Sequence, residues 1–170
     1  MSQLEITLTV DGQEHRVQID VRTTLIDALR ERLGVTSVKK GCDHGQCGSC
    51  TVLFDGQRRL TCLSLAAACD GAHLTTAAGL GENGELHPLQ EAFIERDAFQ
   101  CGYCTPGQLC SALGMLAEAD AGHPSHVTAG LSGTPQLSEA EIRERLSGNL
   151  CRCGAYPNIV AAVRDVAEAR

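Results

Sequence analysis

The sequence predicts an α+β fold in two parts, a small mixed sheet with one helix followed by a group of four short helices. Three observations support this prediction. Apolar residues alternate with polar ones early in the chain, and from about Pro88 they recur at helical spacing instead. Eight of the ten cysteines fall into two compact sets, one in each part. We therefore predict one domain at residues 1–78 and a second at residues 85–170.

The first part is predicted to contain five strands and one helix. Alternating apolar residues and glycine-containing turns such as Asp11-Gly12 indicate the strands. They are expected at residues 4–10, 17–21, 51–54, 58–62 and 73–76. The helix follows the first hairpin, where Thr23 or Thr24 can cap its start and Gly34 can end it. A small mixed sheet packed on one helix is the ferredoxin-like β-grasp arrangement.

The second part is predicted to be helical, and four short helices suggest a four-helix bundle. They are expected at residues 88–98, 106–119, 138–148 and 157–169. Thr105 can cap the second of these helices, Pro106 suits its first position, and Ser138 with Glu141 matches a capping box before the third. Residues 120–137 are rich in Gly, Pro, Ser and Thr, which predicts a surface loop.

The early cysteines form the first candidate metal centre, made of Cys42, Cys47, Cys50 and Cys62. They read C-x4-C-x2-C, followed by a fourth cysteine after eleven further residues, which is the plant-type spacing for a 2Fe-2S cluster. Glycines lie beside most of these ligands. A loop that wraps a cluster needs them, because its backbone N–H groups must approach the sulfurs closely. Metal ligation is expected to supply much of the folding free energy of such small domains.

The late cysteines form the second candidate centre, made of Cys101, Cys104, Cys151 and Cys153. Each pair precedes a predicted helix, so two helix N-termini are expected to face one anionic centre, each worth about 0.3–1 kcal/mol. A zinc ribbon built from the two C-x2-C pairs is the alternative, but it leaves four cysteines without a role. Disulfides are the other alternative, and a reducing compartment disfavours them.

Charge and hydropathy exclude several classes of function. The chain has 14 Lys and Arg against 21 Asp and Glu, a formal net charge of −7, and no basic stripe, which argues against nucleic-acid binding. No apolar run reaches the roughly 18 residues of a membrane span and no signal peptide is visible, so a cytoplasmic location is expected. Cys69 and Cys110 lie in apolar stretches and are interpreted as core residues. No residue qualifies as a nucleophile or general base, and we predict no catalytic residue.

Three motifs resemble the small iron-sulfur subunit of the xanthine oxidase family of molybdenum hydroxylases. They are residues 41–50 with Cys62, the run Gln-Cys-Gly-Tyr-Cys-Thr-Pro at 100–106, and the run Gly-Asn-Leu-Cys-Arg-Cys-Gly at 148–154. Within this family, residues 122–154 are similar to the three-subunit bacterial aldehyde dehydrogenases. The small subunit of those enzymes also carries a long insert between the second and third late ligands, which here is 46 residues.

This resemblance implies an electron-transfer role. A large partner subunit would hold molybdenum on a pterin dinucleotide (molybdopterin) and oxidise aldehydes to carboxylic acids, and a third subunit would hold FAD. The late cluster would face the pterin, with Gln100 hydrogen-bonded to the molybdenum cofactor and Cys153 nearest the pterin. The early cluster would face the flavin.

Two alternatives stay open at this point. The chain would play the same part in a dehydrogenase of xanthine or of N-heteroaromatics such as purines, isoquinoline or nicotinate. A stand-alone ferredoxin is the other alternative, although it leaves residues 85–170 unexplained. Periplasmic members of the aldehyde-oxidising group have a twin-arginine leader, and nothing before Leu4 resembles one, so a periplasmic location would require a leader ahead of this sequence.

Overall fold

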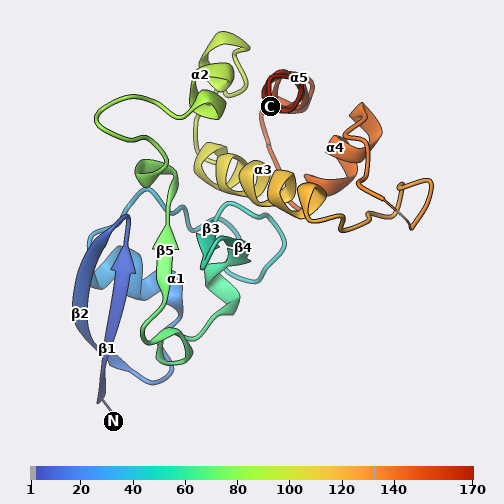
Figure 1. Ribbon diagram of the computed structural model, residues 1–170. Coiled ribbons are helices and arrows are strands. Elements are labelled where there is room, and N and C mark those ends of the chain that lie inside the picture. The colour runs from blue at the N-terminus through green and yellow to red at the C-terminus, as the bar shows by residue number, and fades with distance from the viewer. Residues whose placement is uncertain (1–2, 132) are drawn as a thin grey trace.

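The computed structural model describes residues 3–131 and 133–170, with a sheet-containing half adjacent to a helical half (Figure 1). The sheet has five strands in the order β2-β1-β5-β3-β4. The strands are β1 (Gln3–Val10), β2 (Gln13–Asp20), β3 (Thr51–Phe54), β4 (Gln57–Leu60) and β5 (His73–Thr75). β1 and β5 run parallel and the other neighbours antiparallel, so the predicted mixed sheet is confirmed.

The first hairpin follows from the alternation of apolar residues. Ile6, Leu8 and Val10 are buried, and the residues between them are more exposed. Asp11 and Gly12 both have positive φ, 49° and 80°, as a type I′ hairpin turn requires. The predicted turn is therefore confirmed.

The helix of the sheet half is shorter and less regular than predicted. α1 (Leu25–Asp27) begins after Thr24, whose hydroxyl accepts the N–H of Asp27 at 3.3 Å. The chain continues in π-helical turns over Ala28–Arg32, and Gly34 with φ +71° follows its end. The predicted helix is present, but only its first turn is α-helical.

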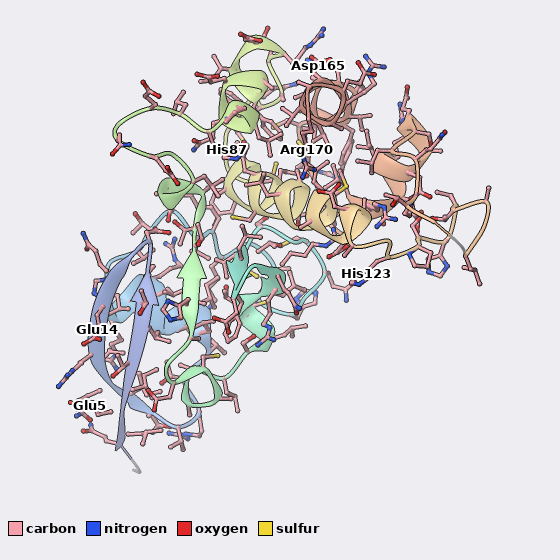
Figure 2. All side chains as sticks on the ribbon, viewed as in Figure 1. Glu5, Glu14, His87, His123, Asp165 and Arg170 are labelled. Atoms are coloured by element: carbon pink, nitrogen blue, oxygen red, sulfur yellow. The ribbon has the colours of Figure 1, made fainter. Side chains whose placement is uncertain are left out.

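The four helices predicted in the second half are confirmed. They are α2 (Pro88–Glu95), α3 (Thr105–Asp120), α4 (Glu139–Arg145) and α5 (Tyr156–Glu168). α5 packs against α2 and α4, whereas α3 lies against β3 and β4 (Figure 1). Because α3 packs on the sheet half, the predicted four-helix bundle is not confirmed. His87, labelled in Figure 2, caps α2, and Ser138 caps α4 as predicted.

Each half has its own apolar core. Leu8 and Leu74 belong to the core of the sheet half, and Phe93 belongs to that of the helical half. Cys69 and Cys110 are buried members of these two cores, as predicted. Burial raises the pKa of both thiols, that of Cys110 to about 12. No helix in the part of the chain that the structure describes has the length and apolar character needed to cross a bilayer.

The loop between α3 and α4 is anchored by a buried ion pair. Glu141 and Arg145, 4% and 7% exposed, pair at 3.0 Å. Glu141 also accepts the hydroxyls of Ser125 and Thr128, and Arg145 donates to the His123 carbonyl at 2.6 Å. Removing one partner of such a pair leaves a buried charge alone, at a cost of about 3–5 kcal/mol. The predicted surface loop is therefore held in one place.

Arg58 of β4 joins the two halves. Its guanidinium donates to both carboxylate oxygens of Glu118 in α3, at 2.7 and 2.8 Å. It also donates to the carbonyl of Arg145 in α4 at 2.6 Å. A bidentate pair of this kind fixes orientation as well as distance, so α3 and α4 are tied to the edge of the sheet.

Candidate metal centres

The first cysteine set comes from two neighbouring segments. Its members are Cys42, Cys47 and Cys50 in the loop before β3, and Cys62 in the 3₁₀ turn Thr61–Leu63 after β4. β3 and β4 pair with Thr51 opposite Leu60, so this hairpin returns the chain to Cys50. The gap between the third and fourth cysteines is therefore the length of one tight hairpin. β4 ends at Leu60, so the strand predicted at 58–62 was too long.

Within the first set the thiols approach in pairs. Cys47 lies close enough to Cys42, and Cys50 close enough to Cys62, to affect the pKa of the neighbouring thiol. A 2Fe-2S cluster has four cysteine ligands on two irons, two on each. The paired arrangement thus fits a two-iron centre.

Backbone N–H groups face the sulfur of Cys42. The N–H of His44 is the main cause that lowers the pKa of Cys42 to about 6, and the N–H of Gln46 donates to the same sulfur at 3.2 Å. Burial, with the neighbouring Cys50 thiol, raises the pKa of Cys62 to about 11. N–H groups that converge on sulfur stabilise thiolate, which is the form that binds iron.

The loop also leaves space beside its sulfurs. A Cβ atom on Gly41 would lie 2.8 Å from the Cys47 sulfur, so a side chain there would clash with the thiol. Lys40, the preceding residue, contacts Asp27 of α1 at 2.8 Å and Asp43 of the loop at 2.9 Å. These carboxylates, Asp27 first, raise the pKa of Lys40. The ion pairs hold the loop against α1 and support Asp43, which has a φ of 60°.

The second cysteine set joins the segments that precede α3 and α5. Cys104 occupies the N-cap position of α3, and Cys151 and Cys153 precede α5. Cys104 and Cys151 lie close enough to affect each other's pKa, and Cys101 is exposed. Both helices begin one residue before the predicted start, at Thr105 and Tyr156, and each has a proline in its first turn. The second set thus lies at two helix N-termini, where N–H groups are free to face an anion.

The thiols of this set differ in acidity. Burial, with the Cys151 thiol beside it, raises the pKa of Cys104 to about 12. Burial acts on Cys151 as well, but the N–H groups of Ala155, Cys153 and Gly154 outweigh it and lower the pKa of Cys151. The N–H of Ala155 donates to its sulfur at 3.4 Å. Metal binding at such a pair would release a proton from Cys104.

Thr105 does not cap α3, contrary to the prediction, because Cys104 takes the cap position and Thr105 is the first helical residue. The Thr105 hydroxyl is buried and has no hydrogen-bond partner among the residues described. Leaving a buried hydroxyl unpaired costs about 1–3 kcal/mol. A sulfur of a cluster held by the adjacent Cys104 would be a suitable acceptor, so the chemistry of this site fits an iron-sulfur group.

Gln100, the predicted cofactor contact, lies exposed beside the second set. Its amide nitrogen donates to the carbonyl of Cys153 at 3.3 Å. The two residues predicted to face the pterin are thus brought together. Phe99, Tyr103 and Leu150 are large side chains exposed near them, 39%, 48% and 51% accessible. Both polar and apolar side chains are therefore exposed beside the second set.

The two cysteine loops touch each other. The N–H of Leu150 donates to the Cys47 carbonyl at 2.9 Å, and the Tyr103 hydroxyl donates to the Lys40 carbonyl at 2.7 Å. The hollow between the loops is lined by cysteines of both sets, namely Cys47, Cys101, Cys104 and Cys151. The spacing of the ligands did not predict this junction, because it depends on contacts between distant segments. The sequence feature that could have indicated this junction is the pair Asn149-Leu150, which directly precedes the proposed ligand Cys151.

Two family models cover most of the chain. The model for the 2Fe-2S iron-sulfur cluster binding domain matches residues 8–73. The model for the [2Fe-2S] binding domain matches residues 76–164. Each matched segment contains one of the two cysteine sets.

Individual relatives and solved structures agree with these matches. The chain is 56% identical to the aldehyde oxidoreductase iron-sulfur-binding subunit PaoA of Escherichia coli O157:H7, over 96% of this chain and 72% of that subunit. It is 43% identical to the caffeine dehydrogenase subunit gamma of Pseudomonas sp. (strain CBB1), over 98% of this chain and 92% of that subunit. The crystal structure of quinoline 2-oxidoreductase from Pseudomonas putida 86 is similar with a TM-score of 0.84 and 40% identity, covering 98% of this chain and 95% of that chain.

Proposed function

Because the chain belongs to the small 2Fe-2S subunits of the xanthine oxidase family of molybdenum hydroxylases, we propose that it relays electrons from molybdopterin to FAD during the oxidation of aldehydes to carboxylic acids. It is an electron-transfer subunit of an oxidoreductase complex rather than the subunit that binds substrate. The observation that carries the proposal is the junction at which two sets of cysteine thiols meet.

We assign the metal ligands to the two sets. The first cluster is held by Cys42, Cys47, Cys50 and Cys62, and the second by Cys101, Cys104, Cys151 and Cys153. Thiols in pairs, N–H groups directed at sulfur and two helix N-termini support this assignment. When bound, 2Fe-2S clusters accept and release single electrons, so two in series connect a two-electron oxidation to a flavin. The chain's own residues hold the thiolates in place.

The two centres are proposed to face different partners. The face with Gln100 and Cys153 would meet a large molybdopterin-binding subunit, where the Gln100 amide can hydrogen-bond the cofactor. Leu63 and Leu65, 65% and 51% exposed, flank the first set beyond Cys62 and would meet an FAD-binding subunit. Exposed apolar side chains beside each centre support both contacts.

The domain limits and the location are part of the same proposal. Two separate apolar cores support a division into two domains close to the proposed ranges 1–78 and 85–170, although Ala77 of the first range packs in the second core. A cytoplasmic location stays a prediction.

Aldehydes are the proposed substrates, because the aldehyde oxidoreductase subunit is the more similar of the two relatives described above. The second candidate is an N-heteroaromatic dehydrogenase. The likeness to caffeine dehydrogenase and to quinoline 2-oxidoreductase favours it. Assaying the purified complex with aldehydes, purines and quinolines separates the two.

The proposal is tested by removing one ligand from the assembled complex. The unaltered complex should contain about four iron and four sulfide per chain and show two reduced 2Fe-2S species by EPR. Cys104→Ser should eliminate one species and block reduction of flavin by substrate. Cys110→Ala, a buried cysteine outside both sets in the same helix, is the matched control and should keep both species. Two intact species or normal flavin reduction in Cys104→Ser would contradict the assignment.

A further inference from the structure

Asn149 is a buried amide at the junction between the two cysteine loops, only 6% exposed. Its Nδ2 donates to the carbonyls of Gly48 at 3.0 Å and Gly107 at 3.2 Å. Its Oδ1 accepts the Ser111 hydroxyl at 2.7 Å, and its backbone carbonyl accepts the Gln108 amide at 3.0 Å. Both N–H groups and the oxygen of the amide are thus satisfied.

The segments that meet at Asn149 each adjoin a proposed metal ligand. Gly48 directly follows Cys47 of the first set. Gly107 lies in the first turn of α3, whose N-cap belongs to the second set. Asn149 itself stands two residues before Cys151. One side chain therefore touches the supports of both centres.

These segments are in backbone contact. A Cβ atom on Gly48, where φ is +70°, would lie 2.5 Å from the Gly148 carbonyl oxygen. A Cβ atom on Gly107 would lie 2.4 Å from the Gly48 carbonyl oxygen. The Asn149 amide lies at this close contact, and its two donated hydrogen bonds hold the segments at one spacing.

We infer that Asn149 is a positioning residue that fixes the separation of the two metal centres, an inference that rests on the proposed function. Electron exchange between two centres falls steeply as their separation grows. The residue that follows, Leu150, donates its N–H to the Cys47 carbonyl, so a shift at Asn149 is transmitted to the direct link between the loops. Loss of the amide donors should therefore separate the centres without removing a ligand.

Asn149→Asp is the informative variant because it keeps the shape of the side chain. It removes both N–H donors and places a carboxylate against the carbonyl oxygens of Gly48 and Gly107, which is unfavourable in a buried site. Asn158→Asp is the matched control. The Asn158 amide donates to the Asp97 carbonyl at 3.2 Å, a tertiary contact that links α5 to the end of α2 and involves neither cysteine loop.

The measurements are made on the assembled complex. EPR of the fully reduced protein reports each cluster and the magnetic splitting between them, and hydrogen exchange reports the Leu150 N–H. Asn149→Asp should keep both cluster signals, change the splitting, and speed exchange of the Leu150 N–H by about tenfold or more. Asn158→Asp should leave the splitting and this exchange rate as in the unaltered protein.

Unchanged splitting and exchange in Asn149→Asp would overturn the inference, as would the same changes in Asn158→Asp. If Asn149→Asp loses a cluster, Ser111→Ala becomes the test variant. It removes the hydrogen bond to the Asn149 amide oxygen and leaves both N–H groups of that amide bonded. It should keep both cluster signals and change the splitting and the Leu150 exchange rate relative to the unaltered protein, and no change in either would refute the positioning role. An unaltered complex with fewer than two cluster signals would instead refute the proposed function.

Discussion

Gly107→Ala tests whether close packing of α3 on the first cysteine loop is needed for stability. A Cβ atom at this position would lie 2.4 Å from the Gly48 carbonyl oxygen and 2.9 Å from two backbone carbons of Ser49. All of these atoms belong to backbone, so no side chain can move aside. The loop or the helix must shift as a whole.

Two opposing effects determine the magnitude. Alanine in place of glycine favours the helix by up to about 1 kcal/mol. Overpacking a well-packed contact costs about 1–3 kcal/mol. Since rigid backbone bears the overlap here, we expect the upper part of that range and a net loss of about 1–2 kcal/mol in the free energy of unfolding. For a chain of this size, this corresponds to a fall of about 2–8 °C in the unfolding midpoint.

The assay is thermal unfolding of the cluster-loaded protein, followed by circular dichroism and by the visible absorption of the clusters. Gly148→Ala is the control, since it lies at the same junction but a Cβ atom there meets nothing within 4 Å. The control should unfold at the same temperature as the unaltered protein or slightly higher. A Gly107→Ala variant as stable as this control would refute the reasoning.

Two further predictions concern single groups. Thr105→Val should lower the reduction potential of the second centre by about 40 mV. The reason is that a hydrogen bond from the Thr105 hydroxyl to a cluster sulfur, worth about 1 kcal/mol, would stabilise the reduced cluster. An unchanged potential in an EPR-monitored redox titration would refute this prediction. Burial lowers the pKa of His87, whose neutral Nδ1 accepts the Leu89 N–H at 3.1 Å. Because the unfolded chain binds this proton more tightly, the cap is fully effective above the unfolded pKa of about 6.5 and weakens as pH falls through the lower folded value. His87→Asn, which keeps an acceptor, should therefore lose less thermal stability than the unaltered protein between about pH 7 and pH 5, and an equal loss in both would count against the cap.

The elements that depend on neighbouring residues could be predicted from the sequence. The Asp11-Gly12 turn and the Ser138 cap follow from local rules, and the structure confirms both. The π-helical turns at Ala28–Arg32 could not be predicted, because apolar periodicity does not distinguish them from an α-helix. Thr105 does not cap α3 because Cys104 occupies the N-cap position, which helix-capping preferences do not predict.

The burial of the Glu141–Arg145 pair could not be predicted from the sequence either. Its partners, the Ser125 and Thr128 hydroxyls and the His123 carbonyl, come from the preceding loop, 13 to 22 residues away in sequence. No local pattern marks a carboxylate as buried when its compensation comes from a loop. The loop composition predicted exposure correctly in general, but not that the loop is anchored.

In the candidate site, too, local features could be predicted from the sequence and contacts between distant segments could not. The sequence could identify which cysteines belong together, because ligand spacing is local and the β3–β4 hairpin accounts for the longest gap in the first set. It could not show that the two sets meet, because that depends on backbone contact between Gly48 and Gly107 and on one amide from a third segment. Neither half forms this junction without the other. The contacts that bring the sets together are also contacts between the two halves, along with the Arg58 pair to Glu118. Packing of the halves and the distance over which electrons must pass are therefore set by the same atoms, so substitutions that loosen the packing should slow electron transfer even where every ligand remains.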